Sequence, residues 1–233
     1  MNPAGPQRAA SVRARLLNVA KAQGVDFSQV LVRFALERML YRLTRSPHAD
    51  RFLLKGALLF TLWYDMPHRA TRDADLLGFG ASDLESVARV FRDIAAVAAD
   101  DGIVFDPASV TVEEIRKEAG YGGVRVIVSG ELARARCRTQ IDVGFGDAVT
   151  PAPVDSIYPV LLEEMPAPRL RTYPVTVPDG PPAGLTDEFA HDASRQSLWL
   201  AFLRKNELPP EPLPRIVDRL RRALLPALDA VVR

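Results

Sequence analysis

Three aspartates stand where aspartate is rare, inside short apolar runs that resemble strands. Asp73 and Asp75 lie in Arg72-Asp73-Ala74-Asp75-Leu76-Leu77, and Asp142 lies in Gln140-Ile141-Asp142-Val143. Strands disfavour aspartate because its short polar side chain competes for backbone hydrogen bonds. The strand period of two places Asp73 and Asp75 on one face, where their carboxylates repel each other unless a cation lies between them.

A divalent cation would remove that repulsion. Mg²⁺ prefers oxygen ligands and is often bound by one or two carboxylates together with substrate phosphates. Carboxylates around two metal ions suit nucleotidyl transfer, in which charge on the transferring group must be neutralised. We therefore predict that Asp73 and Asp75 bridge metal ions to a triphosphate. Asp142 would bind the second ion and help to deprotonate the attacking hydroxyl.

A glycine turn precedes this strand. At Lys55-Gly56-Ala57, Gly56 would let a phosphate approach backbone amides at the start of the following helix. Simpler roles stay open, because Lys55 can cap a helix or extend to water and Arg69 can pair with Asp65. The predicted nucleotide-binding residues are Lys55, Gly56, Ala57, Arg69 and Arg72.

The surrounding pattern alternates between helices and strands. Helices are expected over residues 11–23, after Asp26, over 57–64 and after Asp83, and strands over 73–79, 103–105, 110–115, 124–129 and 137–145. The last two strands are expected to pair around Gly130-Glu131. In the helix after Asp26, the arginines at positions 33, 38, 42 and 45 are expected on the polar side. This order predicts an α/β or α+β domain built on a small mixed sheet.

The chain changes character after Thr150, because 13 of its 19 prolines fall between Pro151 and Pro214. We predict a nucleotidyltransferase domain with its N-terminal helices at residues 1–150, a proline-rich connector at 151–184 and a helical region at 185–233. In that region Thr186 is expected to cap a helix over 187–206, and a second helix is expected over 213–225.

Composition excludes several classes of protein. The single Cys137 rules out a disulfide framework, no run approaches the roughly 18 apolar residues of a membrane span, and no signal peptide is evident, so we expect a cytoplasmic protein. The three histidines lack metal-ligand spacing, which argues against zinc. Residues 1–72 carry 12 Lys and Arg against 4 Asp and Glu, a net charge of +8, which suggests a polyanionic partner. Arginines on solvated helix faces remain the alternative.

Three segments resemble the AbiEii/AbiGii toxin family of nucleotidyltransferases, the toxins of type IV toxin-antitoxin systems. They are Leu54-Lys55-Gly56-Ala57-Leu58, Thr71-Arg72-Asp73-Ala74-Asp75-Leu76 and Gln140-Ile141-Asp142-Val143-Gly144-Phe145-Gly146-Asp147. The resemblance covers most of residues 10–175 and reappears at Pro181–Phe189, which looks like the family's closing helices.

The resemblance implies a DNA polymerase β-like nucleotidyltransferase fold, Mg²⁺, an NTP donor, a cognate antitoxin and, in some members, transfer to tRNA 3′ ends. Asp73, Asp75 and Asp142 match the family's metal carboxylates. Gly56 matches its glycine turn, with Ala57 where many relatives have Gly or Ser.

The chain departs from the family after Tyr173-Pro174. Relatives continue into a helical segment with a lysine and an Arg-x-Lys-Asp-type motif that helps to bind nucleotide, but here no lysine lies between Lys117 and Lys205. This looks like an internal deletion, so the shortened helical C-terminal region is expected to leave a metal-competent site that binds nucleotide poorly. It would also expose apolar surface for a partner or a homo-oligomer to cover.

The leading interpretation is a Mg²⁺-dependent nucleotidyltransferase toxin with a nucleic-acid acceptor and impaired activity. The alternative is an inactive remnant of the same fold that binds RNA or a protein. A third interpretation, a Mn²⁺ and nucleotide-sugar site of a glycosyltransferase, fits poorly with the short chain and the early position of Asp-x-Asp.

Overall fold

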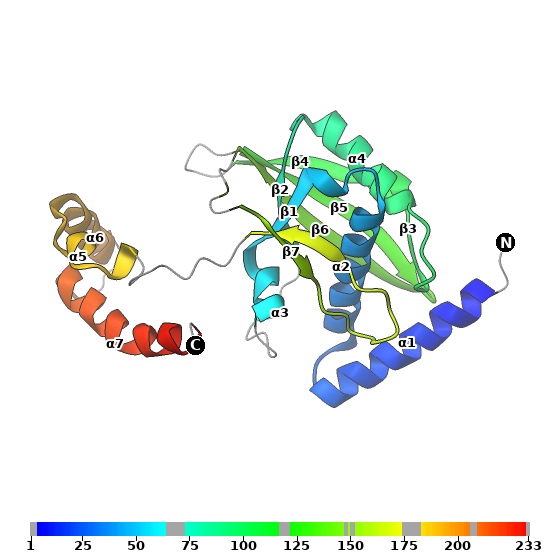
Figure 1. The fold of residues 1–233 in the computed structure, drawn as a ribbon, viewed down its shortest axis with the longest axis horizontal. Coiled ribbons are helices and arrows are strands. Elements are labelled where there is room, and N and C mark those ends of the chain that lie inside the picture. Colours follow the sequence, from blue (N-terminus) through cyan, green and yellow to red (C-terminus); the bar gives the residue numbers. More distant parts are fainter. Residues whose placement is uncertain are drawn as a thin grey trace. The chain divides into compact units, whose positions relative to one another are not determined.

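The computed structural model describes residues 4–63, 73–116, 122–146, 149, 152–173, 183–205 and 209–231. The chain divides into two compact units, Met1–Pro174 and Val175–Arg233, and each is described by itself. The first unit contains a mixed sheet with helices packed against it (Figure 1).

The first unit has the mixed α+β architecture expected of a nucleotidyltransferase-like fold. Its helices are α1 (Ala4–Gln23), α2 (Phe27–Arg45), α3 (Phe60–Trp63) and α4 (Leu84–Ala96), with a 3₁₀ helix η2 (Gly56–Leu59) before α3. Its strands are β1 (Phe52–Lys55), β2 (Asp73–Gly78), β3 (Ile103–Phe105), β4 (Thr111–Arg116), β5 (Gly122–Leu132), β6 (Ala135–Phe145), β7 (Val154–Ile157) and β8 (Arg169–Thr172).

Strand order brings distant parts of the sequence together. In the described residues the sheet runs β3-β5-β6-β2-β1-β8-β7, with β4 paired to β5 beside β3. β2 lies between β1, to which it is antiparallel, and β6, to which it is parallel. The two segments that carry the three aspartates are therefore adjacent strands.

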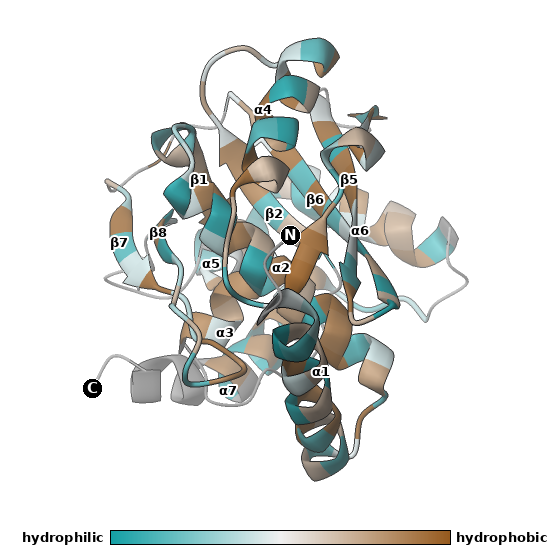
Figure 2. Cartoon of the chain, turned by 90° about the vertical axis from the view of Figure 1, so that its right-hand side faces the viewer, coloured by the Kyte–Doolittle hydropathy of each residue, from teal (hydrophilic) through white to brown (hydrophobic). Residues whose placement is uncertain are grey.

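The two faces of the sheet differ in chemistry. Helices α1, α2 and α4 pack against one face, where Leu76, Val126 and Val143 join the hydrophobic core. Neighbouring residues in each strand point to the opposite face, and the alternation of hydrophobic and hydrophilic residues along β5 and β6 is visible in Figure 2. Asp75 and Asp142 each adjoin one of those core residues in sequence, so they point away from the helices.

Two helix starts were predicted correctly. Asp26 caps α2 and Asp83 caps α4, and each carboxylate accepts a backbone hydrogen bond from the first turn, at 2.7 Å from Ser28 and 2.9 Å from Ser86. The start predicted for α1 was wrong, because that helix begins at Ala4 and not at Ser11.

The arginines of α2 do not share a polar side, as the sequence pattern suggested. Arg38 and Arg42 are buried, at 0% and 2% exposure. Arg42 binds Asp101 through two hydrogen bonds, at 2.6 and 3.0 Å, and also donates to the carbonyl of Ile103. Arg38 donates to the carbonyl of Pro166 and pairs with Glu37. Burial of these charges is compensated by partners from distant segments, which a helical pattern alone does not reveal.

The expected connector at residues 151–184 is partly sheet. β7 and β8 pair with each other, and β8 pairs with β1 at Thr172 and Leu54. The backbone amide of Tyr173 continues this pairing by donating to the carbonyl of Leu54, at 3.0 Å. The prolines at 159, 166 and 168 lie between the two strands, so they shape the loop without interrupting either strand. The first unit accordingly extends to Pro174, beyond the predicted boundary at residue 150.

The second unit contains α5 (Asp187–His191), α6 (Ala193–Lys205) and α7 (Leu213–Val231). Thr186 caps α5 as expected, but the single helix predicted over 187–206 is interrupted at Asp192. The Asp192 carboxylate accepts from the backbone of Arg195 and so starts α6. None of the helices in the described ranges is long and apolar enough to cross a membrane.

Candidate functional site

A row of charged side chains crosses four strands in register. Asp75 of β2 lies opposite Lys55 of β1 on one side and opposite Asp142 of β6 on the other. Asp142 in turn lies opposite Arg125 of β5. Residues opposite one another in paired strands point to the same face. We call these four residues, Lys55, Asp75, Asp142 and Arg125, the charged row.

Asp73 belongs to the same face. It lies two residues before Asp75 in β2 and opposite Gln140 of β6. Asp73, Asp75 and Asp142 are all half-buried, as expected for side chains on a partly covered sheet surface. The three acids predicted from the sequence are thus on one side of the sheet, which the idea of a common site requires.

Gly56 and Asp75 are in close contact. Gly56 has a φ of +72°, a conformation that glycine adopts without strain. A Cβ atom at this position would lie 2.2 Å from Oδ2 of Asp75, so no other residue fits without moving the carboxylate. The turn therefore positions Asp75 directly. The helix that was expected to follow the turn begins as the 3₁₀ helix η2, which contains Ala57, and α3 continues it to Trp63, the last residue described before position 73.

Lys55 extends over the sheet toward β6. Its Nζ would lie 2.9 Å from a Cβ on Gly144, two residues after Asp142. The ammonium group therefore stays on the face that carries the acids, where it can bind an anion. Arg69 and Arg72, the other predicted cations, lie outside the described residues.

Arg125 is the strongest partner of Asp142, and the sequence analysis missed it. Its Nε donates to Oδ1 of Asp142 at 2.9 Å and its Nη2 donates to Oδ2 at 2.8 Å. The amide of Gln140 satisfies both its ends when its oxygen accepts from Nε of Arg125, at 3.1 Å. The pKa of Arg125 is raised, chiefly by the hydrogen bonds to Asp142, with further attraction from Asp142, Glu113 and Asp73. Bidentate pairs of this kind are strong and directional.

The donor set fits a hard divalent cation. Carboxylates from adjacent strands offer oxygen ligands on one face, and Asp142 already binds a positive group, the guanidinium of Arg125. Among the described residues, no three His, Cys, Asp or Glu side chains are close enough to form a complete metal cluster. Because Mg²⁺ commonly takes one or two carboxylates plus substrate phosphates, a smaller protein ligand set suffices.

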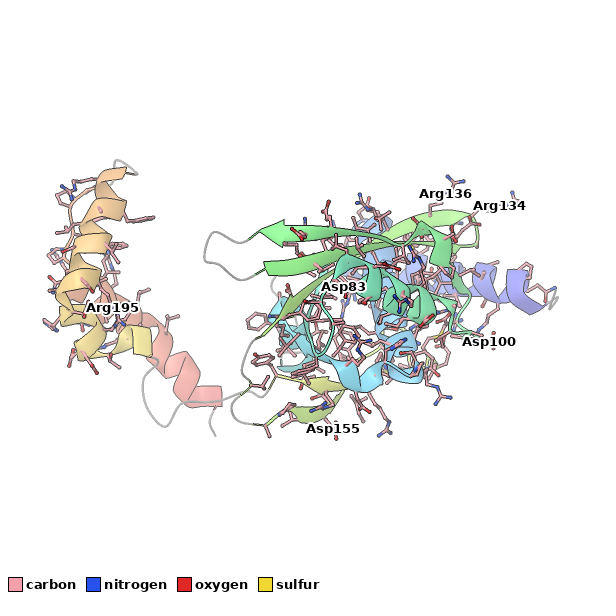
Figure 3. The ribbon with its side chains drawn as sticks, turned by 90° about the horizontal axis from the view of Figure 1, so that it is seen from above. Asp83, Asp100, Arg134, Arg136, Asp155 and Arg195 are labelled. Carbon is pink, nitrogen blue, oxygen red and sulfur yellow. The ribbon has the colours of Figure 1, made fainter. Side chains whose placement is uncertain are left out.

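A hollow of about 1360 Å³ lies elsewhere, between α1, β3 and the turn of the β5–β6 hairpin. None of the three acids lines it. Arg134 and Arg136, which are part of its lining, lie at the end of the hairpin (Figure 3). The chemistry suggested by the carboxylates therefore belongs to the sheet face that carries the charged row, outside this hollow.

The comparisons with known proteins add one match. Residues 38–177, more than half of the chain, match the family model described as nucleotidyl transferase AbiEii toxin, type IV TA system. The chain belongs to the AbiEii family. No curated protein and no solved structure matched it. The AbiEii match spans β1, β2, β5 and β6, so it includes every residue of the charged row, and it ends close to the boundary between the two units.

Membership confirms the family resemblance noted in the sequence and the nucleotidyltransferase-like fold. It also makes the protein a relative of toxins of type IV toxin-antitoxin systems, for which a cognate antitoxin is expected. The C-terminal helices α5, α6 and α7 lie outside the matched range.

Proposed function

We propose that this AbiEii protein is a Mg²⁺-dependent nucleotidyltransferase that transfers a nucleotide from an NTP to a nucleic-acid acceptor, with the tRNA 3′ end as the first candidate. The observation that carries the proposal is the placement of Asp75 and Asp142 opposite each other on adjacent strands, beside Gly56 and Lys55. Asp73 shares their face.

Each residue of the site would have its own role in the reaction. Asp75 and Asp142, with Asp73 beside them, would hold Mg²⁺, which when bound supplies positive charge at the transferring phosphate. Gly56 keeps the Asp75 carboxylate in place, and Lys55 would attract the triphosphate. In the reaction, the acceptor hydroxyl oxygen forms a bond to the α-phosphorus, the bond from that phosphorus to the β-phosphate oxygen breaks, and pyrophosphate leaves. The hydroxyl proton passes to a carboxylate of the site or to water.

Two features favour a second function. Arg125 donates to both oxygens of Asp142, and the sequence has no lysine between Lys117 and Lys205, where the family resemblance implies a basic segment after Tyr173-Pro174. Both features suit a silent site, so the second candidate is a binding module that recognises RNA or a protein without catalysis.

Labelled NTPs with bulk tRNA separate the two candidates. Mg²⁺-dependent transfer of label that is lost in Asp75→Asn and in Asp142→Asn supports the enzyme. A matched control is Asp155→Asn, because Asp155 is an exposed acid on β7, outside the three strands that carry the charged row's acids and Lys55. RNA retention without transfer in the unaltered protein supports the binding module.

A further inference from the structure

We propose that Arg125 acts as an internal cation for the metal site: it neutralises Asp142 in the metal-free protein and limits how tightly a divalent cation binds there. The inference rests on the proposed function, because it concerns the same carboxylates. It assigns Arg125 an electrostatic role at this site that no sequence pattern indicated.

Arg125 is built into the sheet. β5 and β6 pair along ten positions, and the pairing fixes Arg125 opposite Asp142. The side chains of Arg125 and Asp142 are 33% and 19% exposed, so water screens their contact only in part. On its other side, Arg125 lies 3.8 Å from Glu113 of β4, which lies opposite it in the adjacent strand pair. The guanidinium thus lies between two acids, Asp142 and Glu113, on the two strands that pair with β5.

Arg125 and a metal ion would compete for the same ligand. The guanidinium uses one lone pair on each oxygen of Asp142, since its two donors form a parallel fork. A divalent cation bound to either oxygen would lie close to this positive group, and like charges at that separation repel. Arg125 must therefore lower the affinity of the site for metal unless it moves.

Arg125 also stabilises the metal-free sheet. Asp75 and Asp142 are opposite each other with Asp73 on the same face, so these acids would repel in the absence of cations. Arg125 on one side and Lys55 on the other reduce that repulsion. The same residue is therefore favourable without metal and unfavourable with it.

The direction in which metal affinity changes when Arg125 is replaced distinguishes this role from a purely structural one. If Arg125 only held Asp142 in a useful orientation, its loss would weaken metal binding. If it competes, its loss strengthens metal binding. Arg125→Gln removes the charge and the fork, whereas Arg125→Lys keeps the charge but cannot make the bidentate contact.

Mn²⁺ titration of the full chain, with free Mn²⁺ measured by electron paramagnetic resonance and no nucleotide present, provides the test. We expect Arg125→Gln to bind Mn²⁺ about tenfold more tightly, because charge-assisted hydrogen bonds to Asp142 no longer compete. Arg125→Lys should lie between that variant and the unaltered chain. Arg136→Gln is the matched control: it makes the same charge change on the same face of β6, about 20 Å along the strand from Asp142, at the hairpin end in Figure 3.

Thermal unfolding supplies a second measurement that is independent of catalysis. Arg125→Gln should unfold at a lower temperature than the unaltered chain without metal, and saturating Mn²⁺ should raise its midpoint more than it raises that of the unaltered chain. Arg136→Gln should respond to Mn²⁺ as the unaltered chain does. Should Arg125→Gln fail to fold, Arg125→Lys carries the comparison.

Each outcome bears on the proposal. Tighter Mn²⁺ binding by Arg125→Gln supports it, also where the unaltered chain binds too weakly to measure. Equal or weaker binding by Arg125→Gln, with clear binding by the unaltered chain, overturns the competitive role and leaves the metal site intact. If neither chain binds Mn²⁺, the internal-cation role and the proposed metal-dependent function both fail.

Discussion

Replacing Gly56 by alanine tests the contact that positions Asp75. The substitution has two costs, because the backbone has a φ of +72° and the new Cβ would lie 2.2 Å from Oδ2 of Asp75. The first cost is about 1–2 kcal/mol for an L-residue in the left-handed region. The second resembles overpacking, at roughly 1–3 kcal/mol, and is relieved only if the carboxylate or the turn moves.

Gly24→Ala separates these two costs. Gly24 has a φ of +65°, close to that of Gly56, but no atom lies within 4 Å of its would-be Cβ. It therefore carries the backbone cost alone. We expect Gly56→Ala to lose roughly 1–3 kcal/mol more than Gly24→Ala. For a chain of this size, the difference corresponds to about 2–4 °C in the midpoint of thermal unfolding per kcal/mol.

Metal binding should follow the contact with Asp75. Gly56→Ala displaces Asp75 and should weaken Mn²⁺ binding, while Gly24→Ala, at the end of α1, should leave it unchanged. Thermal unfolding and Mn²⁺ titration of both variants provide the check. If the two variants lose the same stability and bind Mn²⁺ with the same affinity, the contact with Gly56 does not fix the position of Asp75.

Three further predictions concern the core of the first unit. Arg42→Ala should lower the free energy of unfolding by about 3–5 kcal/mol in urea titrations, because it leaves the carboxylate of Asp101 buried without its partner. Arg42→Met combined with Asp101→Leu removes both charges and should lower the free energy of unfolding far less. Burial raises the pKa of Glu37 despite the attraction of Arg38, so the folded chain binds this proton more readily than the unfolded one. As pH rises from the ordinary glutamate pKa through the raised one, the free energy of unfolding of the unaltered chain should therefore decrease relative to that of Glu37→Gln. Burial raises the pKa of Cys137 to about 11, so a thiol reagent at pH 8 should label it, by mass spectrometry, only after the chain unfolds.

Local signals in the sequence predicted local structure well. Caps such as Asp26 and Asp83 act within one turn of their own helix, so a short window of sequence contains the whole interaction. The aspartates at 73, 75 and 142 were identified for a similar reason, since a carboxylate within a strand pattern stands out without knowledge of its neighbours.

The register of the β5–β6 hairpin could not be predicted, and this explains why Arg125 was missed. A turn at Gly130-Glu131, as glycine suggested, would have placed Arg125 opposite Arg136. The turn instead lies at Ala133-Arg134, both with positive φ, and this shifts Arg125 opposite Asp142. Non-glycine residues seldom adopt that conformation, so composition points away from the true turn.

The burial of two arginines in α2 was also not predicted, because it too depends on residues far away in the chain. Arg38 and Arg42 resemble surface residues in a helical pattern; besides the adjacent Glu37, which pairs with Arg38, their burial depends on two distant partners, Asp101 and the carbonyl of Pro166. Those partners lie 59 and 128 residues away from them in the chain. A single sequence offers no signal for such pairs.

The charges on the site face explain why metal and nucleotide should depend on each other in the proposed reaction. Asp73, Asp75, Asp142 and Glu113, the last opposite Arg125, carry four negative charges, while Lys55 and Arg125 carry two positive charges, so these six groups have a net charge of −2 without metal. This balance disfavours a triphosphate. One divalent cation cancels this net charge and offers a positive centre to phosphate. Arg125 reduces the negative charge of the metal-free site, and this stabilises the sheet without metal at the expense of metal affinity.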